Sequence, residues 1–276
     1  MFARQVGHAS RRHRRCHRQR PFVDEQCRSL ACDFELMRLD AATFLLQWSS
    51  GGLAFLWFTL RSKEISSGYS KLLRATFGIL AALGSVAGFY FDATIIREIA
   101  AIAVACMALA TFAKPRSRFD LVAAGIGAVG LVGSVVANDG GVVDLVRVLV
   151  GAAFLGAVTD LMLLGHWYLV QPGMTRKLLN DLTNAVLVIW PLEVLAMILP
   201  TGMISVLNGS IDDGWNGILG YFWLGCATLT GLLAVFTRAA LKERSYSAVM
   251  AATGLSYLAI LTAFGTDLVA RATLAL

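Results

Sequence analysis

The chain has 276 residues, of which 57% are hydrophobic and 15% charged, and its formal net charge is +6. Ordinary soluble domains carry about 25% charged residues, so this composition excludes a soluble globular protein. A transmembrane β-barrel is excluded as well, because its strands alternate polar and apolar residues in segments of about ten, whereas the apolar runs here are longer and do not alternate.

Eight apolar stretches are each close to the roughly 20 residues that a helix needs to cross about 30 Å of hydrocarbon. None has the polar face, repeating every 3.6 residues, that is typical of a helix in a soluble protein. The sequence therefore predicts an all-α polytopic integral membrane protein, a bundle of about eight transmembrane helices, as a single domain. We expect the spans at residues 41–60, 72–91, 95–113, 121–138, 143–170, 178–199, 217–237 and 248–269.

The first 36 residues differ from the rest of the chain. They hold eight arginines and four acidic residues, so without them the net charge falls to about +2. Met37 stands just before the first apolar stretch, and the preceding segment lacks the apolar core of a signal peptide. We predict that residues 1–36 are a disordered basic leader or an over-extended start, followed by the membrane domain over residues 37–276. The cysteines and histidines of the leader match no zinc spacing, so we predict neither a metal site nor nucleic-acid binding.

Basic residues gather in every second loop, after the first, third, fifth and seventh spans. The intervening loops contain aspartates instead, such as Asp92, Asp139 and Asp212. Because Lys and Arg accumulate in cytoplasmic loops, both termini are expected to be extracytoplasmic. The low-lysine residue usage is typical of a GC-rich bacterial gene, which favours a bacterial inner membrane. The basic loop residues are Arg61, Lys63, Lys71, Lys114, Arg116, Arg118, Arg176, Lys177, Arg238, Lys242 and Arg244.

Small residues repeat at helical spacing along one face of the fourth span. Faces of this kind allow two helices in a membrane to approach closely. We expect the face to pack against the fifth span or against a second copy of the chain. The expected partners are thus the lipid bilayer, other membrane subunits or a homo-oligomer. The face consists of Ala123, Gly127, Gly130 and Ser134.

Charged residues inside the apolar stretches are costly unless they are paired or hydrated, so each is a candidate functional residue. One group lies toward the outer ends of the spans. Within it, Arg147 and Glu193 are expected to pair, because the fifth and sixth spans are consecutive and antiparallel. The group is interpreted either as structural ion pairs or as part of a transport site. Its members are Arg97, Glu98, Arg147, Glu193, Asp267 and Arg271.

A second polar group lies toward the inner side, and Asp160 is its deepest member. His166 follows on the same span, but a helix turns 100° per residue, so the two lie about 120° apart and roughly 9 Å apart in height. They cannot bond to each other within one helix. The candidate intramembrane site consists of Asp160, His166, Arg147 and Glu193, with Asn180, Asp181, Asn184, Arg97 and Asp267 as supporting polar residues.

His166 stands at the inner end of the fifth span, in the stretch GHWYLVQPGM. Trp167 and Tyr168 are typical of the aromatic belt at a bilayer surface, which favours an interfacial histidine that bonds Asn180 or Asn184. The alternatives are a quinone or haem contact through His166, Trp167 and Tyr168, and a proton relay with Asp160. One histidine cannot supply both axial ligands of a b-type haem. We therefore predict no cofactor and keep quinone and haem as alternatives.

The sixth span contains the stretch IWPLEV, in which Pro191 stands two residues before Glu193. Proline clashes with the carbonyl four residues earlier, so a kink is expected near Leu187. A proline kink beside an acidic residue occurs in transport pathways, where freed carbonyls can bind ions. It also occurs in helices that bend only to pack.

The chain has no phosphate loop, zinc-protease helix or serine-hydrolase elbow. The stretch GIGAVG matches a dinucleotide pattern but lies inside an apolar span without a preceding strand. We therefore expect no enzyme. The first hypothesis is a non-enzymatic membrane subunit or accessory protein. The alternatives are a transporter or proton-coupled permease that uses Asp160, Glu193 and Arg147, and an electron-transfer subunit that uses His166 with quinone or haem.

Overall fold

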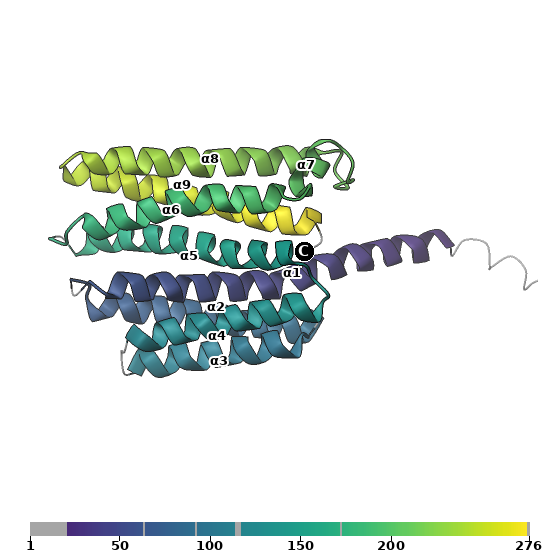
Figure 1. The fold of residues 1–276 in the computed structure, drawn as a ribbon, viewed down its shortest axis with the longest axis horizontal. Helices are drawn as coiled ribbons and strands as arrows, with labels where there is room; N and C mark the ends of the chain where they lie inside the picture. The colour runs from purple at the N-terminus through teal and green to yellow at the C-terminus, as the bar shows by residue number, and fades with distance from the viewer. Residues whose placement is uncertain (1–20, 63, 92, 114–116, 172, 275–276) are drawn as a thin grey trace, which may run out of the picture.

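The computed structural model describes residues 21–62, 64–91, 93–113, 117–171 and 173–274, and gives only the backbone course for 21–40 and 113. Throughout these ranges the regular structure is helical (Figure 1). The helices are α1 (Pro21–Leu60), α2 (Ser67–Phe91), α3 (Ile95–Ala113), α4 (Ser117–Ala137), α5 (Val142–Val170), α6 (Lys177–Ile198), α7 (Gly202–Leu207), α8 (Ile218–Lys242) and α9 (Tyr246–Leu274).

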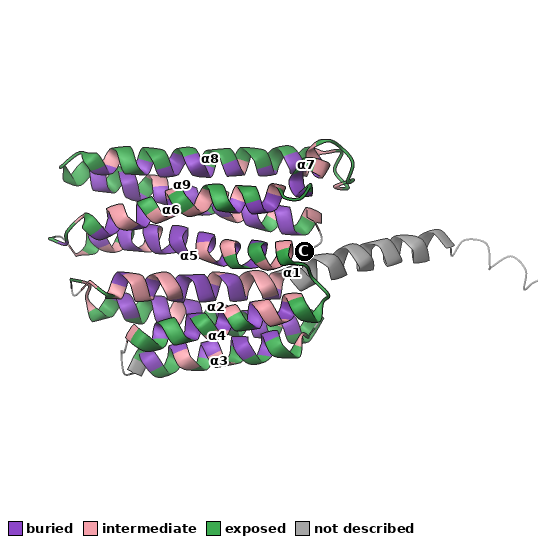
Figure 2. Cartoon of the chain, viewed as in Figure 1, coloured by how far each residue is buried: buried purple, intermediate pink, exposed green. Residues whose placement is uncertain are grey.

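Seven of the described helices, α2 to α6, α8 and α9, are long and apolar enough to cross a membrane. Their outward faces carry large apolar side chains such as Ile79, Phe89 and Leu261, which are exposed (Figure 2). A soluble protein rarely exposes so much apolar surface, whereas lipid solvates it. The prediction of an all-α polytopic membrane bundle is confirmed, and the protein is a multi-pass membrane protein. The predicted leader falls partly on residues 1–20, outside the described residues.

The first predicted span, residues 41–60, is the C-terminal half of α1 and is not among these seven. Its apolar run is interrupted by Gln47, Ser49 and Ser50, all of which are buried. These side chains face other helices rather than lipid, and their hydroxyl and amide groups bond backbone carbonyls of α2, α5 and α1 itself. The mean hydropathy of this stretch is lower because these polar residues are buried between helices and do not face lipid.

The helices form two units of four that lie side by side (Figure 1). In the first unit α1, α2, α3 and α4 close a ring, and in the second α5, α6, α8 and α9 do the same. The units meet mainly where α1 packs against α5. We call the end of the bundle with Gly141 and Leu274 the outer end and the opposite end the inner end, following the predicted orientation. The helices α1, α2, α3 and α4 run in the same directions as α5, α6, α8 and α9, respectively.

The contact between α1 and α5 is close enough for the backbones to touch. A Cβ on Gly51 would overlap the carbonyl of Ala152, and a Cβ on Gly156 would overlap the backbone of Gly51. Glycine is the residue that permits such a crossing between membrane helices. Beside the crossing, Trp48 Nε1 donates to Thr159 Oγ1 at 2.8 Å. This seam holds the two units together.

The small-residue face of α4 packs inside the first unit. Gly127 lies against Ser50 of α1, and Gly130 lies against Ala100 of α3. The expectation of packing against α5 or a second copy is therefore wrong for this face. Its residues are buried because α4 closes the ring with α1 and α3, and α4 touches α5 only lightly.

The loop between α7 and α8 is organised by Asp213. Its carboxylate accepts backbone N–H groups of Trp215 at 2.9 Å, Gly217 at 2.8 Å and Leu219 at 2.9 Å. These hydrogen bonds, with that of Gly217 the strongest contribution, lower the pKa of Asp213 below its ordinary value. The bond to Leu219 satisfies an N–H of the first turn of α8, where a negative charge also complements the helix dipole.

Candidate functional site

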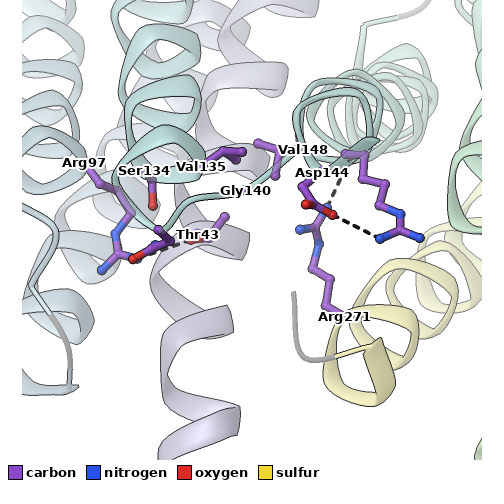
Figure 3. Close-up of a pocket in the computed structure, with 10 residues that line it drawn as sticks. Thr43, Arg97, Ser134, Val135, Gly140, Asp144, Val148 and Arg271 are labelled. Carbon is purple, nitrogen blue, oxygen red and sulfur yellow. Dashed lines mark hydrogen bonds and ion pairs between the residues drawn. The ribbon is translucent and has the colours of Figure 1, made fainter. Parts of the chain in front are cut away.

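A cavity of about 160 Å³ lies at the outer end, between the two four-helix units (Figure 3). Three arginines line it: Arg97 from α3, Arg147 from α5 and Arg271 from α9. Figure 3 shows Arg97 on one side of the cavity, with Asp144 and Arg271 on the other. A cluster of guanidinium groups inside an apolar bundle is costly and is a mark of function in a membrane protein.

Arg97 is held by its sequence neighbour. Its Nε and Nη2 atoms both lie 2.9 Å from Glu98 Oε1, and its Nη1 donates to Thr43 Oγ1 of α1 at 3.3 Å. Both side chains of the ion pair are buried. Gly88 of α2 provides the space, because a Cβ there would overlap the Glu98 carboxylate. Arg97, predicted as a charged residue of the outer layer, is therefore held in place by α1 and by its ion pair with Glu98.

Arg147 joins the end of α6 to α5. Its Nε donates to the Ala196 carbonyl at 3.0 Å and its Nη2 to the Leu199 carbonyl at 2.7 Å. Its Nη1 pairs with Asp144 at 3.1 Å. The predicted ion pair between Arg147 and Glu193 is not formed, because the last carbonyls of α6 need donors and take those of Arg147.

Arg271, Asp267 and Gln47 meet beside Gly151 of α5. Arg271 Nε donates to Asp267 Oδ2 at 2.9 Å, and Arg271 Nη2 to the Arg147 carbonyl at 3.3 Å. A Cβ on Gly151 would lie 2.5 Å from Gln47 Nε2, 2.8 Å from Asp267 Oδ1 and 2.9 Å from Arg271 Nη2. Side chains of α1 and α9 therefore bring polar atoms to one point beside α5, and the missing side chain of Gly151 provides the space.

Gly151→Ala is expected to lower the free energy of unfolding by about 1–2 kcal/mol, because an added methyl group forces these side chains apart. The cost stays moderate since the nearest atoms are the ends of flexible side chains. Gly254→Ala on α9 is the matched control, as a Cβ there meets nothing within 4 Å. Chemical unfolding in detergent micelles measures both, and equal stability of the two variants would contradict the crowded geometry.

Glu193 lies deeper than the arginines and is fully buried. The Asp267 carboxyl faces it, and Arg147 and Arg271 are within electrostatic range. Neither Glu193 oxygen accepts a hydrogen bond from an N–H or O–H donor of the described residues, and the same holds for Asp267 Oδ1. Buried polar atoms without partners are rare in proteins and call for an explanation such as an ion, a proton or a ligand.

Asp160 does not join this group. It stands 13 residues after Arg147 on α5, which places it about 20 Å farther along the helix. The side chain is fully buried, and neither oxygen has a hydrogen-bond partner among the described residues. The Tyr69 hydroxyl of α2, also without a partner, is within electrostatic range. Asp160 and Tyr69 thus form a second polar location in the core.

The predicted quinone or haem contacts do not converge. His166 is exposed on the outside of α5 and meets the Tyr257 ring edge-on, with 6.3 Å between ring centroids. Trp167 Nε1 donates to Gln171 Oε1 at 3.0 Å, and the Tyr168 hydroxyl donates to the Met174 carbonyl. The two aromatic residues therefore shape the α5–α6 turn.

The predicted partners of His166 are engaged elsewhere. Asn180 Nδ2 donates to the Arg176 carbonyl at 3.1 Å, and Asn184 is exposed. Neither is hydrogen-bonded to His166 in the part of the chain that the structure describes. The predicted hydrogen bond from His166 to Asn180 or Asn184 is therefore not formed, because His166 packs against Tyr257 of α9 and Asn180 bonds within its own helix.

A second cavity, of about 340 Å³, lies at the inner end of the same junction between units. Arg61 and Glu64 line it from the first unit, and Lys177 and Asp181 from the second. Glu64 Oε2 accepts the Thr175 hydroxyl at 2.7 Å and the Thr175 N–H at 3.2 Å. These bonds, the hydroxyl's first, lower the pKa of Glu64. Charged cavities thus open at both ends of the junction.

One buried ion pair escaped the sequence analysis. Arg74 of α2 and Asp120 of α4 are each 1% exposed, and two hydrogen bonds of 2.8 and 2.6 Å join them. Arg74 was passed over although it lies within the second predicted span, and Asp120 just precedes the fourth. The sequence does place one positive and one negative residue at the inner ends of α2 and α4, and this was the signal that could have indicated the pair.

No group of three or more His, Cys, Asp or Glu side chains among the described residues is placed to hold a metal ion. The polar residues that the structure does bring together are those of the outer layer, around the arginine-lined cavity. Compared with protein-family models, curated proteins and solved structures, the chain matches none.

Proposed function

We propose that this protein is a membrane permease for small anions and that the arginine-lined cavity is its outward-facing binding site. The observation that carries the proposal is the position of Arg97, Arg147 and Arg271 around one cavity inside an apolar bundle. Arginine is suited to carboxylate and phosphate groups because its planar N–H groups can bind two oxygens at once. A cavity of about 160 Å³ accommodates a small polyatomic anion.

The location of the cavity supports transport. Transporters built from two halves hold their substrate at the junction of the halves. Here the outer cavity is lined from α1, α3 and α4 of one unit and from α5 and α9 of the other. The inner cavity lies at the opposite end of the same junction, and the glycine seam of α1 and α5 lies between them. Rocking of the two units about this seam would expose the cavities in turn.

Arg147 keeps binding capacity. Of the five N–H groups of a guanidinium, Arg147 uses one on each of its three nitrogens. Its bonds to α6 carbonyls fix the side chain without neutralising its charge. Arg147 also connects α5 to the end of α6 at the cavity wall. An anion bound to Arg147 would therefore affect how α5 and α6 pack in the second unit.

Uptake of labelled sulfate, phosphate and succinate into vesicles that contain the purified protein tests the proposal. We expect at least one anion to accumulate above protein-free vesicles. Asn138→Trp, which fills the rim of the cavity, is expected to reduce that uptake at least about tenfold. Asn138 lines the cavity and is exposed, so the bulky ring does not disturb the core.

Ser210→Trp is the matched control, because Ser210 is exposed at the same end of the bundle but outside the cavity. It is expected to leave uptake unchanged. Equal uptake by Asn138→Trp and the native chain would show that the cavity is not the entry. A folded native chain that takes up none of the three anions would overturn the permease and favour a non-enzymatic membrane subunit.

A further inference from the structure

The carboxyls of Glu193 and Asp267 face each other in the core of the second unit. Glu193 is on α6 and Asp267 on α9, and the two side chains are within hydrogen-bonding reach of each other. Both are fully buried, and no N–H or O–H donor of the described residues reaches either Glu193 oxygen or Asp267 Oδ1. Two ionised carboxylates can only accept hydrogen bonds, so a bond between them requires that one is protonated.

The balance of charges around the two carboxyls also favours one bound proton. Arg271 and Arg147 are the charged groups within electrostatic range of Glu193 besides Asp267, and Asp144 of α5 forms an ion pair with Arg147. With both carboxyls ionised, these five residues carry two positive and three negative charges. One proton makes the group neutral, which is the favoured state in a medium of low dielectric constant. The Arg97–Glu98 pair is neutral by itself.

The uncharged surroundings offer no alternative counter-charge. Gln47 of α1 contributes an amide whose Oε1 has no donor. Trp190 Nε1 of α6 donates to the Ala227 carbonyl of α8 at 2.8 Å. The sequences of α7 and of the outer half of α8 contain no charged residue.

We infer that Glu193 and Asp267 together form a site for one exchangeable proton that is coupled to anion binding in the outer cavity. The connection is direct: Arg271 lines the cavity and donates to Asp267 Oδ2, and Asp267 faces Glu193. The coupling to an anion rests on the proposed permease function, whereas the shared proton does not. The substrate would then enter as an anion together with a proton.

The sign of the coupling follows from electrostatics. An anion beside Arg147 and Arg271 adds negative charge near the carboxyl pair and so favours its protonated state. By linkage, the proton favours anion binding equally. Anion affinity is therefore expected to increase as the pH falls, by at most about tenfold per pH unit for one proton.

Infrared spectroscopy of the protein in lipid vesicles detects the proton directly through the carboxylic-acid C=O band. Glu193→Gln and Asp267→Asn are each expected to remove the same single band, and the double variant is expected to remove no more. Glu98→Gln is the matched control, because Glu98 is also buried but forms an ion pair with Arg97. It should leave the acid bands unchanged. Intact acid bands in both single variants would overturn the shared proton.

Sulfate affinity measured against pH tests the coupling, since sulfate does not titrate in the neutral range. The native chain is expected to bind sulfate more tightly at lower pH, and Glu193→Gln to bind it with little pH dependence. A native affinity that is independent of pH would overturn the coupling and leave the permease standing. A native chain with no sulfate affinity would remove the coupling and the anion site, while the infrared result would still decide the shared proton.

Discussion

Replacing Arg74 alone by Met, or Asp120 alone by Leu, is expected to lower the free energy of unfolding by about 3–5 kcal/mol. Each single variant leaves one charge buried without its counter-charge. The native pair has no access to water that could replace the lost partner, because both side chains are 1% exposed. Arg74 Nη1 lies 3.4 Å from both Ser70 Oγ and the Thr111 carbonyl, but neither carries a charge.

The double variant Arg74→Met with Asp120→Leu is expected to recover most of this loss, to within about 1–2 kcal/mol of the native chain. Both charges are then absent, and apolar side chains of similar length fill the space between α2 and α4. Unfolding of the purified chain by chemical denaturant in micelles gives all three values. If the double variant lost as much as the sum of the single variants, the destabilisation would come from packing and not from an unpaired charge.

The sequence was sufficient to predict the class of fold. Apolar stretches of the length of a bilayer with few charges leave a chain no alternative to membrane helices, so α2 to α6, α8 and α9 lie where they were expected. Periodicity within a span also indicates which residues share a face. It does not indicate which neighbour covers that face, and the small-residue face of α4 was therefore assigned to the wrong partner.

For the polar residues too, the sequence indicates which residues are unusual but not which partners they have. The cost of burying a charge identifies Arg97, Arg147 and Asp267 as unusual residues from the sequence alone, and these three do lie at the same end of the bundle as Glu193. Their partners depend on the tertiary arrangement. Arg147 was assigned to Glu193 because the spans are consecutive, but α6 ends near Arg147 and its free carbonyls are closer acceptors. The unpaired end of a helix is a feature that a residue pattern does not display.

The seam between α1 and α5 was missed because glycine carries no chemical signal. Gly51 and Gly52 lowered the hydropathy of the first span, and Gly156 looked like one of many glycines in an apolar run. Their role depends on the distance between two backbones, which only the packed bundle defines. The seam also lies between the inner and outer cavities, so the residues least visible in the sequence determine how closely the two units pack.

Gly51→Ala is expected to lower the free energy of unfolding by about 3 kcal/mol or more, at or above the upper end of what added methylenes cost in packed cores. The methyl group would meet the backbone carbonyl of Ala152. A backbone atom in a helix cannot turn aside as a side chain can, so α1 and α5 must separate along the seam. Separation also strains the bond from Trp48 to Thr159.

Gly156→Ala is expected to have a similar effect, because its methyl group would meet the backbone of Gly51 from the other side of the seam. Once one variant has moved the helices apart, the second methyl group costs less, so the double variant should lose less than the sum of the two. Gly125→Ala on α4 is the matched control, since a Cβ there meets nothing within 4 Å. It is expected to be neutral or to stabilise the chain by up to about 1 kcal/mol, because alanine is the better helix former. Denaturation in micelles compares the four variants, and a Gly51→Ala variant as stable as Gly125→Ala would mean that the two units do not touch along α1 and α5.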